Sequence, residues 1–88
     1  MTPIQKKKLK SKAHSLKPVI TIGQQGLTDA VIKETDLTLN AHELIKVRIR
    51  AEKAERQQLS EQLCQAVQAE AIQHIGQIIV IYRKNPEK

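Results

Sequence analysis

The sequence predicts a single α/β domain of residues 1–88, in the order α-β-α-β-α-β-β, with a mixed four-stranded sheet and packed helices. Two observations support this prediction. The spacing of apolar residues switches repeatedly between the helical period and the two-residue period of a strand. The 88 residues contain 40% hydrophobic residues, which suffices for one core and leaves little room for a second. Two strand–helix–strand crossovers followed by a hairpin then give one sheet with helices packed on it.

The first element is a lysine-rich helix over residues 3–14. Thr2 is placed to cap this helix, Pro3 suits its first position, and Gln5 completes a capping box. Its lysines repel one another, so an apolar stripe packed against a core must hold it. The stripe consists of Leu9, Ala13 and Leu16.

The next elements are two strands separated by a turn and a helix. Residues 19–22 form a β-branched run that reads as a buried strand, and residues 23–26 form a turn. A second amphipathic helix runs from Thr28 to about residue 40. Residues 44–51 alternate in the manner of a strand. One face of this predicted strand is apolar, with Ile45, Val47 and Ile49. The other face is basic, with Lys46, Arg48 and Arg50.

The last part of the chain predicts a long helix and a hairpin. The helix covers residues 52–70, with an apolar stripe of Leu59, Leu63, Ala66 and Val67. Residues 71–75 and 78–83 read as strands joined at Gly76-Gln77, which has glycine at the first central position of the turn. The segment Asn85-Pro86-Glu87-Lys88 is expected to fray.

The excess charge of the chain is confined to its N-terminal part. Residues 1–17 contain six lysines and no acidic residue, whereas residues 18–88 contain nine basic and nine acidic residues. A positive field this concentrated attracts a polyanion, either a nucleic acid or an acidic membrane surface. The first helix has none of the tryptophan or phenylalanine that interfacial helices bury, which favours nucleic acid.

Composition argues against several other classes of function. Cys64 is the single cysteine, so no internal disulfide can form, and a reducing cytoplasm is the expected compartment. The longest apolar run, Ile78–Ile81, is far too short to span a membrane. His14, His42 and His74 are far apart in the sequence, and no Cys/His set has the spacing of a zinc site. We therefore expect no catalytic activity, metal, cofactor, small-molecule substrate or membrane association.

The turn between the first strand and the second helix is a candidate anion site. Glycines at both ends let a ligand backbone approach closely. The first free N–H groups of the following helix would point outward there, together with the positive end of the helix dipole. A GxxG tetrapeptide alone is usually only a turn. The lysine-rich helix at the same end of the chain favours a phosphate ligand.

Four segments of the chain carry a family resemblance. They are Leu16-Lys17-Pro18-Val19, Ile22-Gly23-Gln24-Gln25-Gly26-Leu27-Thr28, His42-Glu43-Leu44-Ile45-Lys46-Val47, and Ile75-Gly76 with Val80-Ile81-Tyr82-Arg83. Together they closely resemble the YhbY family of stand-alone bacterial CRM domains, the chloroplast RNA splicing and ribosome maturation module. The resemblance implies a fold like the C-terminal domain of translation initiation factor three. It also implies association with precursors of the large ribosomal subunit, and RNA contact through a GxxG loop similar to that of KH domains.

The loop departs from the family in one respect. Family loops often carry a basic residue between the glycines, whereas this chain has Gln24 and Gln25, whose amides can hydrogen-bond but add no charge. We therefore expect the loop to position the RNA backbone while lysines elsewhere attract it. The candidate RNA-binding residues are Gly23, Gln24, Gln25, Gly26, Leu27 and Thr28 in the loop, Lys6, Lys7, Lys8, Lys10, Lys12 and Lys17 near the N-terminus, and Lys46, Arg48 and Arg50 in the second strand.

Each set of basic residues also has a simpler interpretation. The lysines of the first helix could serve solubility alone, and because they surround the helix, not all of them can face one ligand. The strand cations could form a solvated sheet face, or cover apolar neighbours with their aliphatic stems. Arg83 and Lys84 end the last strand, where fraying is expected, and would contribute little to binding.

The sequence thus predicts a cytoplasmic, monomeric RNA-binding protein that assists ribosome assembly. Its expected partner is ribosomal RNA in pre-large-subunit particles, recognised mainly by backbone and shape. The phosphates are expected to contact the amides near Gly26 and Leu27 and the lysines of the first helix. The alternative is a protein–protein adaptor that docks on a ribosomal protein and uses its charge only for steering.

Overall fold

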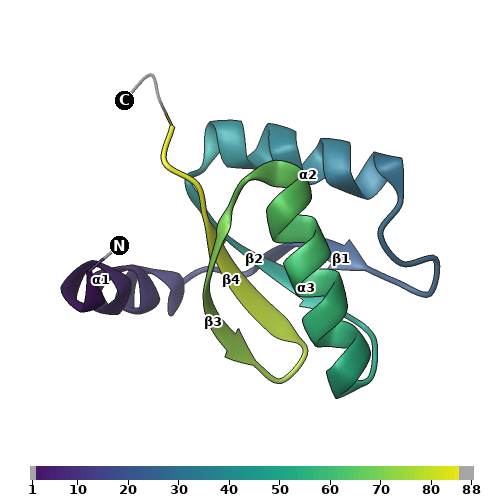
Figure 1. The fold of residues 1–88 in the computed structure, drawn as a ribbon. Coiled ribbons are helices and arrows are strands. Elements are labelled where there is room, and N and C mark those ends of the chain that lie inside the picture. Colours follow the sequence, from purple (N-terminus) through teal and green to yellow (C-terminus); the bar gives the residue numbers. More distant parts are fainter. Residues whose placement is uncertain (1, 86–88) are drawn as a thin grey trace.

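Helices and strands follow one another in the predicted order in the computed structural model, which describes residues 2–85 (Figure 1). One sheet has the order β1-β2-β4-β3, with β1 and β2 parallel and β4 antiparallel to both of its neighbours. The predicted α/β class and mixed four-stranded sheet are confirmed. The helices are α1 (Pro3–Ala13), α2 (Asp29–Ala41) and α3 (Lys53–Val67), and the strands are β1 (Pro18–Ile22), β2 (Leu44–Ile49), β3 (Glu70–Ile75) and β4 (Ile78–Tyr82).

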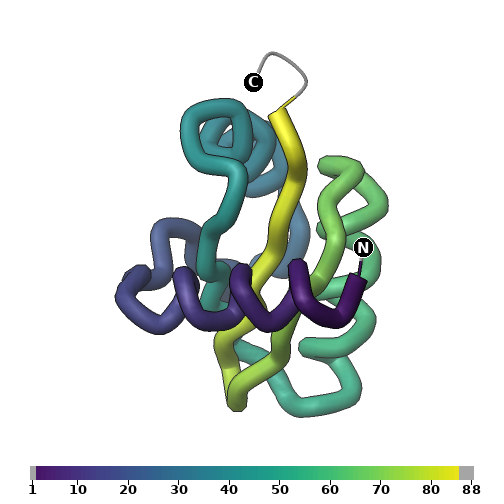
Figure 2. The backbone as a smooth tube through the Cα atoms, turned by 90° about the vertical axis from the view of Figure 1, so that its left-hand side faces the viewer, coloured from purple at the N-terminus to yellow at the C-terminus, as the bar shows by residue number. Residues whose placement is uncertain are grey.

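Different helices cover the two faces of the sheet. α2 and α3 pack on one face, where Ile45, Val47 and Ile49 of β2 are buried in the main core. α1 crosses the strands on the opposite face (Figure 2), where Ala13 shares a smaller core with Val80 of β4. Side chains alternate between the faces of a strand, so the polar positions of β2 lie on the side of α1.

Side-chain caps explain where the first two helices begin. At α1, Thr2 Oγ1 accepts the Gln5 N–H at 3.2 Å, and Gln5 Oε1 accepts the Thr2 N–H at 3.0 Å, so the predicted capping box forms. At α2, Thr28 Oγ1 accepts the Val31 N–H at 3.2 Å. These bonds satisfy backbone donors that a helix leaves without partners in its first turn.

The end of α3 differs from the prediction, which extended the helix to residue 70. α3 ends at Val67 because Gln68 adopts the left-handed conformation, with φ of 56°. The Ala69 N–H then donates to the Cys64 carbonyl at 2.9 Å, which closes the helix, and Glu70 already belongs to β3. Glycine usually marks such an end, and none stands here, so the sequence contained no signal for it.

The buried stripe of α3 is also rotated from the predicted one. Ala66 is exposed, whereas Ser60 is buried in line with Leu63 and Val67. These three residues follow the spacing of one helix face, from which Ala66 is displaced by one residue. The prediction that Ala66 belongs to the buried stripe is therefore wrong. Alanine was expected there because it is apolar, but the fold buries the polar Ser60 instead.

The segment after β4 is held firmly by Arg83. Its Nη1 donates to Asp36 Oδ1 at 2.5 Å and to the Val67 carbonyl at 2.9 Å. Its Nη2 donates to the Asp36 carbonyl and to Asn40 Oδ1, both at 2.9 Å. One guanidinium thus joins the C-terminal parts of α2 and α3 to the end of β4, where the sequence predicted fraying.

Asn85 continues this attachment. Its N–H donates to a Glu43 carboxylate oxygen at 2.6 Å, and its side-chain amide donates to the Asn40 carbonyl at 3.1 Å. The expected fraying is therefore wrong for Asn85. Residues 86–88, the rest of the segment predicted to fray, lie outside the described residues.

Candidate nucleic-acid interface

The connection between β1 and α2 contains a tight turn that projects from the sheet. The Gly26 N–H donates to the Gly23 carbonyl at 3.0 Å, so Gln24 and Gln25 occupy the two central positions, and both are exposed. Gly26 has a φ of +72°, in the left-handed region that favours glycine. Leu27 then packs against the main core. The turn is anchored on both sides and presents its two glutamines to solvent.

The hydrogen-bond donors of this turn differ from the predicted ones. The Gly26 amide, which we expected to bind a phosphate, is already used within the turn. At the start of α2, the Thr28 hydroxyl caps one amide, and Asp29 places a carboxylate in the first turn, where it opposes a second anion. Within residues 2–85, the amides of the two glutamines and of Leu27 donate to no backbone carbonyl. These amides are available to a phosphate, and so are those of Thr28, Asp29 and Ala30, which likewise donate to no backbone carbonyl in this part of the chain.

The two glycines of the turn should respond differently to alanine. A Cβ added at Gly23 would meet no atom within 4 Å, and its φ lies outside the left-handed region. Gly23→Ala should therefore change the free energy of unfolding by less than about 0.5 kcal/mol. Gly26→Ala should lower it by about 1 kcal/mol, because alanine is strained at positive φ. Urea denaturation followed by circular dichroism measures both values, and equal losses would contradict this distinction.

The cations of β2 lead towards the turn. Lys46 and Arg48 are half-buried on the sheet face that α1 covers. The strand ends at Ile49, two residues before the predicted end, and the exposed Arg50 follows. The Arg50 N–H donates to the Ile22 carbonyl at 3.0 Å, so its backbone lies beside the start of the turn. β2 therefore carries a row of cations from beneath α1 to the loop.

α1 divides its lysines between two flanks. Lys8 and Lys12 line a cavity of about 430 Å³ at the end of the sheet where β4 finishes. Helical spacing puts Lys6 and Lys10 on the other side of the stripe that packs on the sheet. Because α1 crosses the strands, this second flank faces the end of the sheet with the β3–β4 turn (Figure 2). The two pairs thus point towards opposite ends of the sheet.

The predicted basic residues therefore fall into two groups. Lys7 lies on the solvent side of α1, Lys17 is exposed in the connection to β1, and Lys8 and Lys12 face the far end of the sheet. The remaining five lie on the α1 side of the sheet: two on the flank of α1 towards the β3–β4 turn, and three along β2 and directly after it. We call these five the basic face: Lys6, Lys10, Lys46, Arg48 and Arg50.

No ion pair neutralises the basic face. Within residues 2–85, the one ion pair joins Arg83 to Asp36. The five cations therefore keep their charge available for a polyanion. In the same part of the chain, no cluster of three or more His, Cys, Asp or Glu side chains is arranged to hold a metal ion. Nor does any helix there combine the length and apolar character needed to cross a membrane.

Cys64 is a packing residue of α3. It is half-buried and packs against the main core. Burial raises the pKa of the Cys64 thiol above its ordinary value, because the thiolate loses solvation. The thiol therefore stays protonated at neutral pH, which makes it a poor nucleophile.

The chain is similar along its length to proteins named for RNA binding. A family model described as CRS1 / YhbY (CRM) domain matches residues 1–83. "Probable RNA-binding protein PA4753" of Pseudomonas aeruginosa is 43% identical over 88 residues, which cover 99% of this chain and 85% of that protein. "Probable RNA-binding protein YqeI" of Bacillus subtilis is 35% identical over 88 residues, which cover 99% of this chain and 92% of that protein.

A solved structure has the same fold. The solution structure of the hypothetical protein SAV1595 from Staphylococcus aureus, for which RNA binding is suggested, matches with a TM-score of 0.83. Its sequence is 40% identical, and the match covers 96% of this chain and 88% of that chain. At this identity, the likeness extends beyond the arrangement of helices and strands to the sequence itself.

Proposed function

The chain belongs to the CRS1/YhbY (CRM) domain family, and from this membership we propose that it is an RNA-binding protein. The RNA backbone runs along the basic face, and the turn from Gly23 to Gly26 fixes its position. One observation carries the proposal: α1 and β2 bring cations from distant parts of the chain to one side of the sheet, and Arg50, at the end of the β2 row, lies beside the turn. The names of the relatives support the same function.

Ribosomal RNA in precursors of the large ribosomal subunit is the RNA that we propose as the target, with the protein acting as an assembly factor. The resemblance of its motifs to the YhbY family supports this target. Tyr82 is the single aromatic residue of the chain and is half-buried, so the sheet offers no platform on which several successive bases could stack. Recognition through phosphates and shape suits structured RNA, whose helices expose backbone and 2′-hydroxyls.

Binding to a large-subunit RNA fragment should weaken steeply with salt. With about five cations in contact with phosphates, log Kd should rise with log salt concentration with a slope of about four. Arg48→Ala should lower this slope by about one, because one phosphate contact is lost. Lys33→Ala, a matched change at an exposed position of α2, should leave it unchanged. Fluorescence anisotropy measures the slopes, and a flat salt response would refute the electrostatic model.

The cellular target requires a separate experiment. Crosslinking in cells followed by sequencing of the bound RNA should enrich large-subunit ribosomal RNA over small-subunit RNA. Nuclease treatment before affinity purification tests the adaptor alternative, because a contact with a ribosomal protein survives removal of the RNA. Partners that persist unchanged after nuclease treatment would count against direct RNA recognition.

A further inference from the structure

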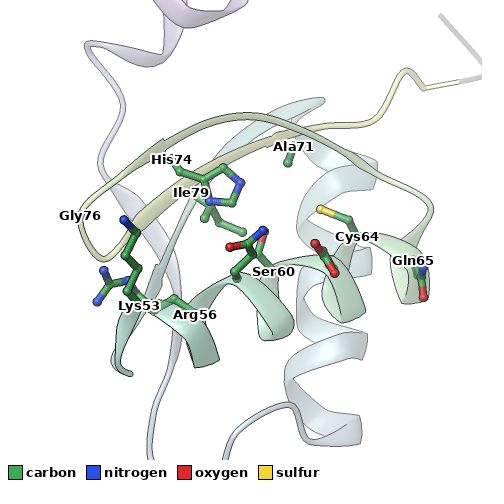
Figure 3. A pocket seen from close by; sticks show the side chains of 11 residues that line it. Lys53, Arg56, Ser60, Cys64, Gln65, Ala71, His74, Gly76 and Ile79 are labelled. Carbon is green, nitrogen blue, oxygen red and sulfur yellow. The ribbon is translucent and has the colours of Figure 1, made fainter.

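A groove of about 640 Å³ lies between α3 and the β3–β4 hairpin (Figure 3). His74 of β3 pairs with Ile79 of β4 across the hairpin, and Ile79 belongs to the main core that α3 covers. Paired residues of neighbouring strands point to the same face, so His74 also points to the side of α3. The groove is therefore separated from the basic face by the sheet.

One end of the groove is cationic. Lys53 and Arg56 from the first turns of α3 lie at this end, close to Gly76 of the hairpin turn, and His74 lies above them (Figure 3). The Arg56 Nη1 donates to the Ala51 carbonyl at 2.7 Å, which holds the guanidinium in place and leaves its other N–H groups for a ligand. Side chains of α3 and β3 thus meet at the cationic end of the groove.

The rest of the groove has an apolar floor and a polar wall. The floor consists of Ala71, Ile79 and the half-buried Cys64. Gln57 and Glu61 of α3 line the wall and supply amide donors, an amide acceptor and carboxylate acceptors. Glu61 is the one carboxylate among the described residues that line the groove, and it disfavours a second anion at its own position.

These features match one nucleotide of single-stranded RNA. Charge-assisted bonds from the cationic end suit a phosphate. The exposed His74 imidazole provides a ring on which an unstacked base can lie, as bases do in many sites for single-stranded RNA. The apolar floor of the groove accommodates the flat surface of the nucleobase. The polar side chains of the wall can hydrogen-bond the edge of the nucleobase. The volume lies within the range of typical ligand sites.

The hairpin turn connects the groove to the basic face. The Ile49 N–H donates to the Gln77 carbonyl at 2.7 Å, and Arg48 pairs with Ile78. The turn thus lies next to the end of β2, where Arg50 follows. Neighbouring strands are about 5 Å apart, so the hairpin is a narrow barrier. An RNA strand that leaves the basic face at this end can pass around the turn into the groove.

We propose that the groove between α3 and the hairpin is a second RNA contact, which takes one unpaired nucleotide with its base on His74 and its phosphate at Lys53 and Arg56. This inference rests on the proposed RNA-binding function and specifies the RNA further. The target has a structured part for the basic face and, beside it, a nucleotide that leaves the helix.

Amide NMR spectra of the nitrogen-15-labelled protein test the groove directly. Adenosine or guanosine 5′-monophosphate should shift the amide signals of Lys53, His74 and Gly76, and ribose 5-phosphate should bind about fivefold or more weakly. His74→Ala should weaken nucleotide binding by about fivefold or more, because the stacking surface is lost. Lys53→Glu should abolish it, whereas His42→Ala, at an exposed histidine after α2, should have no effect.

The outcomes separate this inference from the proposed function. Equal binding of ribose 5-phosphate and the nucleotides, or no shifts at the groove with either, would overturn the nucleotide site. A hairpin RNA with a single-nucleotide bulge provides the second arm. Shifts confined to the basic face would overturn the groove site while RNA binding stands. Shifts at both surfaces would support both, and no shift anywhere would overturn RNA binding itself.

Discussion

Arg83→Met should lower the free energy of unfolding by about 3 kcal/mol. The Arg83 side chain is only 18% exposed and donates to four acceptors on α2 and α3. Methionine keeps the apolar stem but leaves the Val67 and Asp36 carbonyl oxygens without these donors. It also leaves the Asp36 carboxylate without its ion pair. Urea denaturation followed by circular dichroism measures the change.

Two further variants make this test specific. Lys84→Met removes the same charge from the neighbouring exposed residue and should change stability by less than about 0.5 kcal/mol. Arg83→Lys should recover only part of the loss, because an ammonium cannot reproduce the planar fork of a guanidinium. If Arg83→Met were as stable as Lys84→Met, the hydrogen-bond network would contribute no net stability.

Reversing the charges of Lys6 and Lys10 should weaken RNA binding by about tenfold or more. Helical spacing puts both residues on the flank of α1 opposite Lys8 and Lys12, and that flank faces the end of the sheet with the β3–β4 turn (Figure 2). Replacing these two lysines with glutamate removes two contacts with RNA phosphates. The new carboxylates also repel the phosphates of the RNA backbone. Fluorescence anisotropy at about 0.15 M salt measures the affinity, and circular dichroism checks that α1 remains folded.

The matched control is Lys8→Glu with Lys12→Glu. It changes the net charge of the same helix by the same amount, but on the flank that faces the end of β4. Screening over about 8 Å at this ionic strength limits its effect on the basic face, so the loss should stay below about threefold. Equal losses in the two double variants would mean that net charge alone matters, and that no particular face binds RNA.

The sequence predicted those parts of the fold whose signals are local. The capping box of Thr2 and Gln5, the alternation along β2 and the glycine turn of the hairpin each depend on residues within a few positions. The order of elements and the class of the sheet follow from them. The GxxG turn was located correctly for the same reason, although the use of its Gly26 amide within the turn was not foreseen.

The rest depends on contacts between distant segments. Arg83 acquires its role from Asp36, which is 47 residues away, so no spacing rule could reveal it. The flanks of α1 became distinct only when Leu9 and Ala13 packed on the sheet. The groove likewise requires Lys53 and His74 to be brought together by the crossover from α3 to β3. In each case tertiary packing assigned a role to a side chain that the local pattern left open.

The place of β4 in the sheet bears on how the nascent chain folds. β4 is the last strand of this sheet to be synthesised, yet it lies between β2 and β3 and is the neighbour with which β3 pairs. Before residues 78–82 leave the ribosomal exit tunnel, β3 has no partner and the apolar faces of α3 and β2 lack Ile79 and Ile81. The sheet therefore cannot be completed before β4 is available, and we expect the domain to close in one late, cooperative step.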